Sequence, residues 1–194
     1  MKYSFALVNG LNSAGFENGS GIRGGRFEGR DANASAMAVT GSLLYYIKNF
    51  RIQLSGYYGG SVGLTKMEAD SLQLVYGSFG TPVGVYEGNV QYNHNGLSVK
   101  ALATTVQIPD AKKINRAYAN NTPQAMFGYY GEVGYNILHL FHITEKNLTA
   151  FVRYENLNMN YKLPSNGLVN GTIDQQFVIG GLTFQPVKGV TIKA

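Results

Sequence analysis

Apolar and polar residues alternate with a period of two along most of the chain, a pattern that predicts strands with one apolar and one polar face. The clearest case is the stretch in which Phe50, Ile52 and Leu54 alternate with Arg51 and Gln53. Eight such runs are complete, although the eighth is ambiguous because Phe177 and Ile179 lie on the face opposite its other apolar residues, and a ninth begins near the end of the chain. The runs cover residues 2–7, 37–48, 50–58, 86–93, 97–104, 127–136, 148–155, 176–185 and 190–194.

The connections between these runs alternate between long and short. The long ones, rich in Gly, Asn and Ser, are residues 10–35, 59–81, 107–124 and 156–174. The short ones are residues 48–49, 93–96, 138–146 and 186–189. Such sorting places every long loop at one end of an antiparallel sheet, as in membrane barrels with long extracellular loops and short periplasmic turns. We therefore predict an all-β, antiparallel up-and-down transmembrane β-barrel, of which this chain supplies about eight to nine strands.

The composition agrees with a membrane environment. Charged residues make up 14% of the chain, whereas about 25% is typical of globular domains. The 44% of hydrophobic residues are too few to indicate a large soluble core that would compensate. No run approaches the ~20 apolar residues of a membrane helix, so spanning by helices is excluded. We expect one domain over residues 1–194, located in a bacterial outer membrane and in contact with its lipid.

Tyrosines lie near the ends of several apolar strand faces. Two explanations remain open: an aromatic girdle at the membrane interfaces, or the general preference of tyrosine for strands. The residues concerned are Tyr3, Tyr45, Tyr58, Tyr86, Tyr92, Tyr135 and Tyr154.

Several stretches, in order along nearly the whole chain, resemble the Gram-negative outer-membrane porins grouped with the phosphate-selective porins O and P. They include Phe5-Ala-Leu-Val-Asn-Gly-Leu-Asn, Ser20-Gly-Ile-Arg-Gly-Gly-Arg, the run from Leu97 to Ala103 continuing to Ile108-Pro-Asp-Ala, Gly128-Tyr-Tyr-Gly-Glu-Val-Gly-Tyr-Asn-Ile, Phe151-Val-Arg-Tyr-Glu, and Gly180-Gly-Leu-Thr-Phe-Gln-Pro with the final Ile192-Lys-Ala. The resemblance lies in the set of stretches together, since no single stretch identifies the family.

The resemblance implies a barrel of roughly sixteen strands with an aqueous interior, of which this chain covers about half, and it suggests a homotrimer. Family members carry a signal peptide and end on a strand with a terminal aromatic residue. This chain shows neither feature, so we expect it to be an internal fragment.

Enzyme chemistry is not indicated. Residues 19–24 fit the letters of a dinucleotide-binding glycine motif, but no apolar helical pattern follows them. His139 and His142 have only Glu145 nearby, too few ligands for a zinc site. The absence of cysteine excludes thiolate sites. We predict no catalytic residues, no metal, no cofactor and no nucleic-acid partner.

The polar strand faces are the candidate functional surface. If the apolar faces meet lipid, the polar side chains line the interior, where they either tune ion preference or simply hold the wall together through salt bridges. The predicted interior-facing residues are Arg51, Gln53, Tyr57, Glu87, Lys100, Glu132, Arg153 and Glu155. A second set of basic residues, in the first and third long loops, predicts an anion funnel at the channel mouth. It comprises Arg23, Arg26, Arg30, Lys112, Lys113 and Arg116.

The leading hypothesis is a porin-like channel for passive diffusion of small polar or anionic solutes. The net charge of +5 permits anionic partners. The alternative is a non-conducting barrel with a structural or adhesive role through its long extracellular loops. A third possibility, a soluble β-sandwich that binds a ligand, is disfavoured by the low charge content and would bury Ile52, Leu54, Val99, Val133 and Val152 between two sheets.

Overall fold

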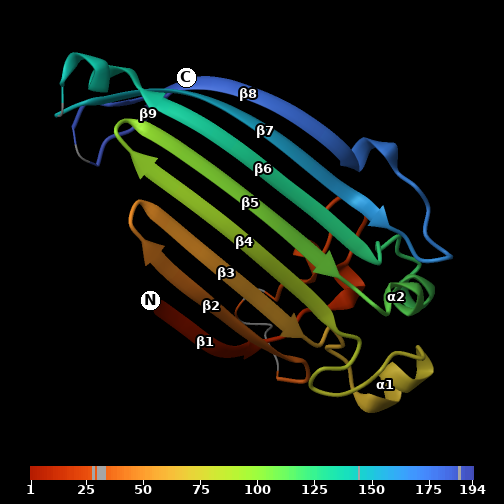
Figure 1. The fold of residues 1–194 in the computed structure, drawn as a ribbon. Coiled ribbons are helices and arrows are strands. Elements are labelled where there is room, and N and C mark those ends of the chain that lie inside the picture. Colours follow the sequence, from red (N-terminus) through yellow and green to blue (C-terminus); the bar gives the residue numbers. More distant parts are fainter. Residues whose placement is uncertain (28, 30–33, 144, 188) are drawn as a thin grey trace.

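The computed structural model describes residues 1–27, 29, 34–143, 145–187 and 189–194. Within them the chain forms one nine-stranded antiparallel sheet, in which every strand pairs with its sequence neighbours and β1 and β9 are the two edges (Figure 1). The strands are β1 (Lys2–Asn9), β2 (Met37–Ile47), β3 (Phe50–Gly59), β4 (Val83–His94), β5 (Leu97–Gln107), β6 (Ala125–Asn136), β7 (Asn147–Lys162), β8 (Asp174–Gln185) and β9 (Ile192–Lys193). The predicted all-β up-and-down architecture is confirmed, with eight full strands and the start of a ninth.

The predicted sorting of connections is confirmed as well. Figure 1 shows the short turns at one end of the sheet and the long connections, which contain α1 and α2, at the other. The helical segments of the described residues are η1 (Ser13–Gly15), η2 (Arg23–Gly25), α1 (Lys66–Ser71), α2 (Ala111–Tyr118), η4 (Ile137–Phe141) and η5 (Gly171–Ile173). None of them replaces a predicted strand. No helix in the described part of the chain is long and apolar enough to span a membrane.

The tight turns explain the register of the hairpins that they close. Between β4 and β5, Asn95 (φ 46°) and Gly96 (φ 80°) both adopt positive φ, as Asn-Gly does in the two-residue turns favoured by twisted hairpins. Lys48 adopts φ 50° in the turn between β2 and β3. These two turns fix which residues of the joined strands face each other.

The largest difference from the predicted boundaries is in the fourth long connection, and smaller ones occur at the ends of other strands. Residues 156–162 belong to β7 and not to the fourth long connection. Asparagine is uncommon in strands, but Asn156 and Asn158 of this segment lie opposite Gln176 and Asp174 of β8, and Lys162 still pairs with Ala125 of β6. Pairing on both sides therefore overrides the local preference of these residues for a loop.

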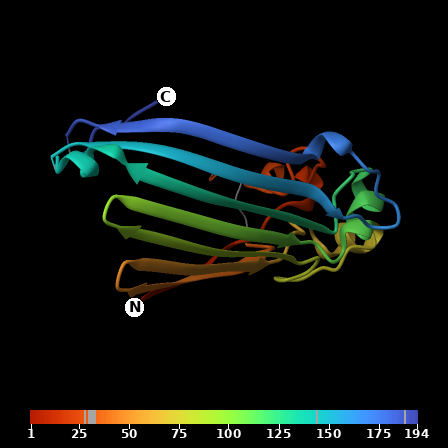
Figure 2. The same cartoon turned by 45° about the horizontal axis from the view of Figure 1, so that its top comes forward.

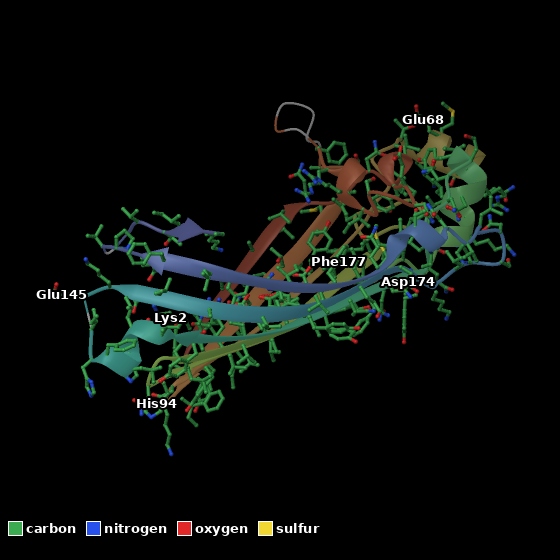
Figure 3. All side chains as sticks on the ribbon, turned by 90° about the horizontal axis from the view of Figure 1, so that it is seen from above. Lys2, Glu68, His94, Glu145, Asp174 and Phe177 are labelled. Carbon is green, nitrogen blue, oxygen red and sulfur yellow. The ribbon has the colours of Figure 1, made fainter. Side chains whose placement is uncertain are left out.

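The hydrophobic core lies among the long connections and not over the middle of the sheet. Phe16, Val62, Val83, Ile108 and Ile114 are fully buried together, with partly buried neighbours from β4, β5 and β7. The sheet is curved, and the first long connection lies on its concave side beside α1 and α2 (Figures 2 and 3). The backbone amide and the hydroxyl of Ser13 both donate to Ser61 O, each at 2.8 Å, and anchor this connection at the end of β3.

The convex face of the sheet carries exposed apolar side chains. Leu54, Val133 and Val152 are 55%, 54% and 60% exposed, and Ile52 is also exposed. A soluble sandwich would cover this face with a second sheet. No segment of the described residues does so, and the sandwich prediction of burial is therefore not met at these positions.

Candidate functional site

A row of polar and charged side chains crosses the concave face. Arg51 of β3 lies opposite Gln91 of β4, which lies opposite Lys100 of β5. Lys100 in turn lies opposite Glu132 of β6, and Glu132 opposite Arg153 of β7. Because paired residues of neighbouring strands share a face, these five side chains form one line across five strands. We call it the charged row.

Glu132 is the centre of this row. Its Oε1 accepts from Lys100 Nζ at 2.7 Å, and its Oε2 accepts from Arg153 Nη2 at 2.6 Å and from Nε at 2.9 Å. Arg153 also donates through Nη1 to Glu155 Oε1 at 2.8 Å, and its guanidinium lies 4.5 Å from the centre of the Tyr130 ring. Glu132 is only 7% exposed, so its charge depends on these two cations.

Two acids and two bases in this cluster cancel in charge. Lys100, Glu132, Arg153 and Glu155 are held in charge-assisted hydrogen bonds, which are among the strongest in proteins. The structure thus favours one of the two roles expected for them, that of cross-strand ties between β5, β6 and β7. Lys100 and Arg153 remain partly accessible from the concave side, since their side chains are 40% and 29% exposed.

Arg51 differs from the other two cations of the row. It donates to Gln53 Oε1 at 3.0 Å and to Gln91 Oε1 at 3.4 Å, both neutral groups. No carboxylate of the described residues forms an ion pair with it, and its buried Nε has no hydrogen-bond partner. Arg51 is therefore held in position without an ion pair to any described carboxylate, which suits contact with a passing anion.

Glu87 and Tyr57 lie nearer the long connections on the same face. Glu87 Oε1 accepts from Asn89 Nδ2 at 2.8 Å. Tyr57 is half-buried, and its hydroxyl oxygen is buried without a hydrogen-bond partner. Gln53 donates from Nε2 to Ser55 Oγ at 3.2 Å and so extends the polar network from Arg51 toward this end of the sheet.

The predicted loop bases are not equivalent. Arg23 and Arg26 are exposed on and after η2, while Lys112 and Arg116 are exposed on α2. Lys113 Nζ instead pairs with Asp110 Oδ1 at 2.8 Å, which offsets its charge. The two residues are three apart in the sequence, a spacing that brings side chains together at the start of a helix such as α2. Arg30 lies outside the described residues.

The glycine motif and the two histidines considered in the sequence lie in short 3-10 helical segments or directly after them. The glycine motif at residues 19–24 leads into the short η2, and a dinucleotide site needs an α-helix there. His139 is exposed in η4, and His142 follows it at φ 60°. Among the described residues, no three His, Cys, Asp or Glu side chains lie close enough together to hold a metal.

No protein-family model matches the chain. An uncharacterized protein of Aquifex aeolicus (strain VF5) is 23% identical over 206 residues, a match that spans 100% of this chain and 44% of that protein. The chain thus covers less than half the length of this relative. The resemblance to outer-membrane porins stays a prediction.

Proposed function

We propose that this chain forms part of the wall of an outer-membrane, porin-like channel that lets small polar or anionic solutes diffuse passively. The observation that supports the proposal most is the inverted sheet: apolar side chains are exposed on the convex face, and the charged row lies on the concave face. A lipid-facing exterior and a water-facing interior require this arrangement. Water-soluble proteins do the opposite.

Aromatic pairs near both ends of the sheet support a membrane location. Phe50 and Tyr92, close to the short turns, have ring centres 4.7 Å apart. Phe127 and Tyr161, close to the long connections, have ring centres 5.7 Å apart. Tyrosine and phenylalanine at two levels of a barrel match the aromatic girdles that border a bilayer.

The remaining strands would come from the rest of a longer protein. The sheet has two open edges, β1 and β9, and the relative from Aquifex aeolicus is more than twice as long as the matched region. Roughly sixteen strands would leave a water-filled interior. A homotrimer belongs to the same proposal.

The charges support a mild preference for anions. The predicted interior-facing residues balance in charge, because the bases Arg51, Lys100 and Arg153 are matched in number by the acids Glu87, Glu132 and Glu155. Arg23 and Arg26 then add two positive charges on the concave side of the sheet. At low salt such charges raise the local anion concentration, and the effect fades as the screening length shortens to ~10 Å at 0.1 M.

The test is single-channel recording of the full-length protein in planar bilayers under a chloride gradient. We expect stepwise conductance and a reversal potential that reports anion preference at low salt. Replacement of Arg23, Arg26 and Arg30 together by Gln should reduce that preference, whereas Lys113→Gln, which removes one base in place of three, should change it less. Absence of conductance, or cation preference in the unmodified channel, would reject the proposal.

A further inference from the structure

A cavity of about 230 Å³ lies between the first long connection and the concave face. Its floor is apolar: Val106 of β5, Met126 of β6, and Leu157 and Met159 of β7 face Ile22 of the connection. These strand residues lie toward the long connections, away from the charged row. An apolar hollow of this kind suits a ligand with a hydrocarbon part.

The first connection is fixed over this cavity by specific contacts. Gly21 and Glu17 exchange two backbone hydrogen bonds of 2.7 and 3.1 Å and form a tight turn. Gly21 adopts φ 58°, and a Cβ built on it would lie 3.1 Å from Met126 Sδ, so a side chain would not fit here without movement. Asn18 Nδ2 donates to Asn121 O at 3.3 Å and joins the turn to the third connection.

Two arginines lie at the rim of the same cavity. Arg23 and Arg26 both line it, Arg23 as the first residue of η2 and Arg26 as the residue that follows η2. Both side chains are exposed, and no carboxylate of the described residues forms an ion pair with either of them. Guanidinium groups bind carboxylates through two parallel hydrogen bonds. The cavity thus combines an apolar floor with two arginines at its rim.

We propose that this cavity binds small amphipathic monocarboxylates, with the hydrocarbon part on Met126, Leu157 and Met159 and the carboxylate at Arg23 and Arg26. Its size corresponds to about eight water molecules at ~30 Å³ each, which fits a ligand such as benzoate or hexanoate. Inorganic phosphate would meet the arginines but leave the apolar floor unused. The inference rests on the proposed function only for the role of the site in solute passage, because binding itself needs no open channel.

The test is equilibrium binding to the full-length protein in detergent, measured by isothermal titration calorimetry. The probes are benzoate, its neutral counterpart benzyl alcohol, and phosphate. Benzoate should bind at least ten-fold more tightly than either of the others. Arg23→Gln with Arg26→Gln should weaken benzoate binding at least ten-fold, and Arg23→Lys with Arg26→Lys should restore part of the loss. Arg116→Gln, which removes an exposed base of α2 outside the cavity, is the matched control and should leave binding unchanged.

A second variant probes the floor without touching the charge. Leu157→Asn keeps the branched shape and the number of heavy atoms of the side chain but makes it polar, at a partly exposed position, and it should weaken benzoate severalfold while leaving phosphate binding unchanged. Equal binding of benzoate and benzyl alcohol, or no loss in the Arg23 and Arg26 double variant, would overturn the inference. If the double variant does not fold, the comparison of ligands on the unmodified protein and the Leu157→Asn result decide it. Benzoate binding without any bilayer conductance would reject the channel and keep the site.

Discussion

Arg153 and Glu132 lie directly opposite each other on β7 and β6, and two nitrogens of the arginine donate to the same glutamate oxygen at 2.6 and 2.9 Å. Lys100 of β5 binds the other oxygen at 2.7 Å. One nearly buried carboxylate therefore joins three strands and binds two cations. Both the stability of this part of the sheet and the charge of its concave face depend on that carboxylate.

Replacement of Glu132 by Gln should have two effects. It should lower the free energy of unfolding by about 1–3 kcal/mol, because it leaves two partly buried cations without their shared partner. It should also increase anion preference, because Glu155 then remains the one acid of the cluster against the two bases Lys100 and Arg153. Urea unfolding of the full-length protein in lipid vesicles measures the first effect, and the reversal potential measures the second. A variant as stable as the parent would contradict the ties described here.

Variants of Arg51 and Arg153 should separate the effect of a positive charge on ion preference from its effect on the stability of the sheet. Either Arg51→Gln or Arg153→Gln removes one positive charge from the concave face, so both should reduce anion preference. Only Arg153→Gln should cost about 1–3 kcal/mol of unfolding free energy, since only Arg153 binds carboxylates. Arg51→Lys is the control that keeps the charge. Equal destabilisation by the two Gln variants would show that the ion pairs do not contribute as inferred.

The strand faces were predictable from the sequence, but the charged row was not. Alternation at Arg51, Gln53, Lys100, Glu132 and Arg153 assigns these residues to one face. Whether they fall on the same line depends on register, and the sequence fixes register only across tight turns such as Asn95-Gly96. The register of β3 with β4, and of β5 with β6, is set across long connections, whose packing no short pattern encodes.

The loop region was the least predictable part for a related reason. Its buried cluster combines single apolar residues such as Phe16, Val62 and Ile114 from three connections that are distant in sequence. None of these residues belongs to a period-two strand pattern. The short α2 was also missed, because eight residues of mixed polarity within a long connection give a weak helical signal.

Asn115 should hold the third connection together. Its Nδ2 donates to Thr122 O at 3.0 Å, and its Oδ1 accepts from the Thr122 amide at 2.6 Å, in a buried setting. Asn115→Ala should leave both backbone groups unsatisfied and lower the stability of this connection by about 1–3 kcal/mol. Limited proteolysis should then cut the third connection faster than in the parent. Lys112→Ala, an exposed change on the same helix, should not alter the rate.

Thr65 should control the pKa of Glu68 at the start of α1. The Thr65 hydroxyl and backbone amide both donate to Glu68 Oε2, at 2.7 and 2.9 Å, and these bonds hold the pKa of Glu68 below its ordinary value. Because the folded-state pKa is lowered, the stabilisation is present above the ordinary pKa and is lost as the pH falls through the folded-state value. Thr65→Ala should raise the pKa of Glu68 toward its ordinary value, as carboxyl NMR titration would measure. Ser71→Ala removes a hydroxyl that bonds the backbone of Glu68, and it should leave this pKa unchanged.

The most direct test of the central claim, that the concave face meets water and the convex face meets lipid, is site-directed labelling along β5 of the full-length protein. Single cysteines would replace Ser98, Leu102 and Thr104 on the concave face. Further single cysteines would replace Val99, Ala101 and Ala103 on the convex face. This chain has no cysteine of its own, and any elsewhere in the full-length protein would be removed first. In vesicles, a charged maleimide reports exposure to water, and quenching of an attached fluorophore by brominated lipid reports exposure to the bilayer. The account predicts reaction with the charged maleimide at the first three positions and lipid quenching at the last three. Maleimide reaction at all six positions without lipid quenching would contradict it.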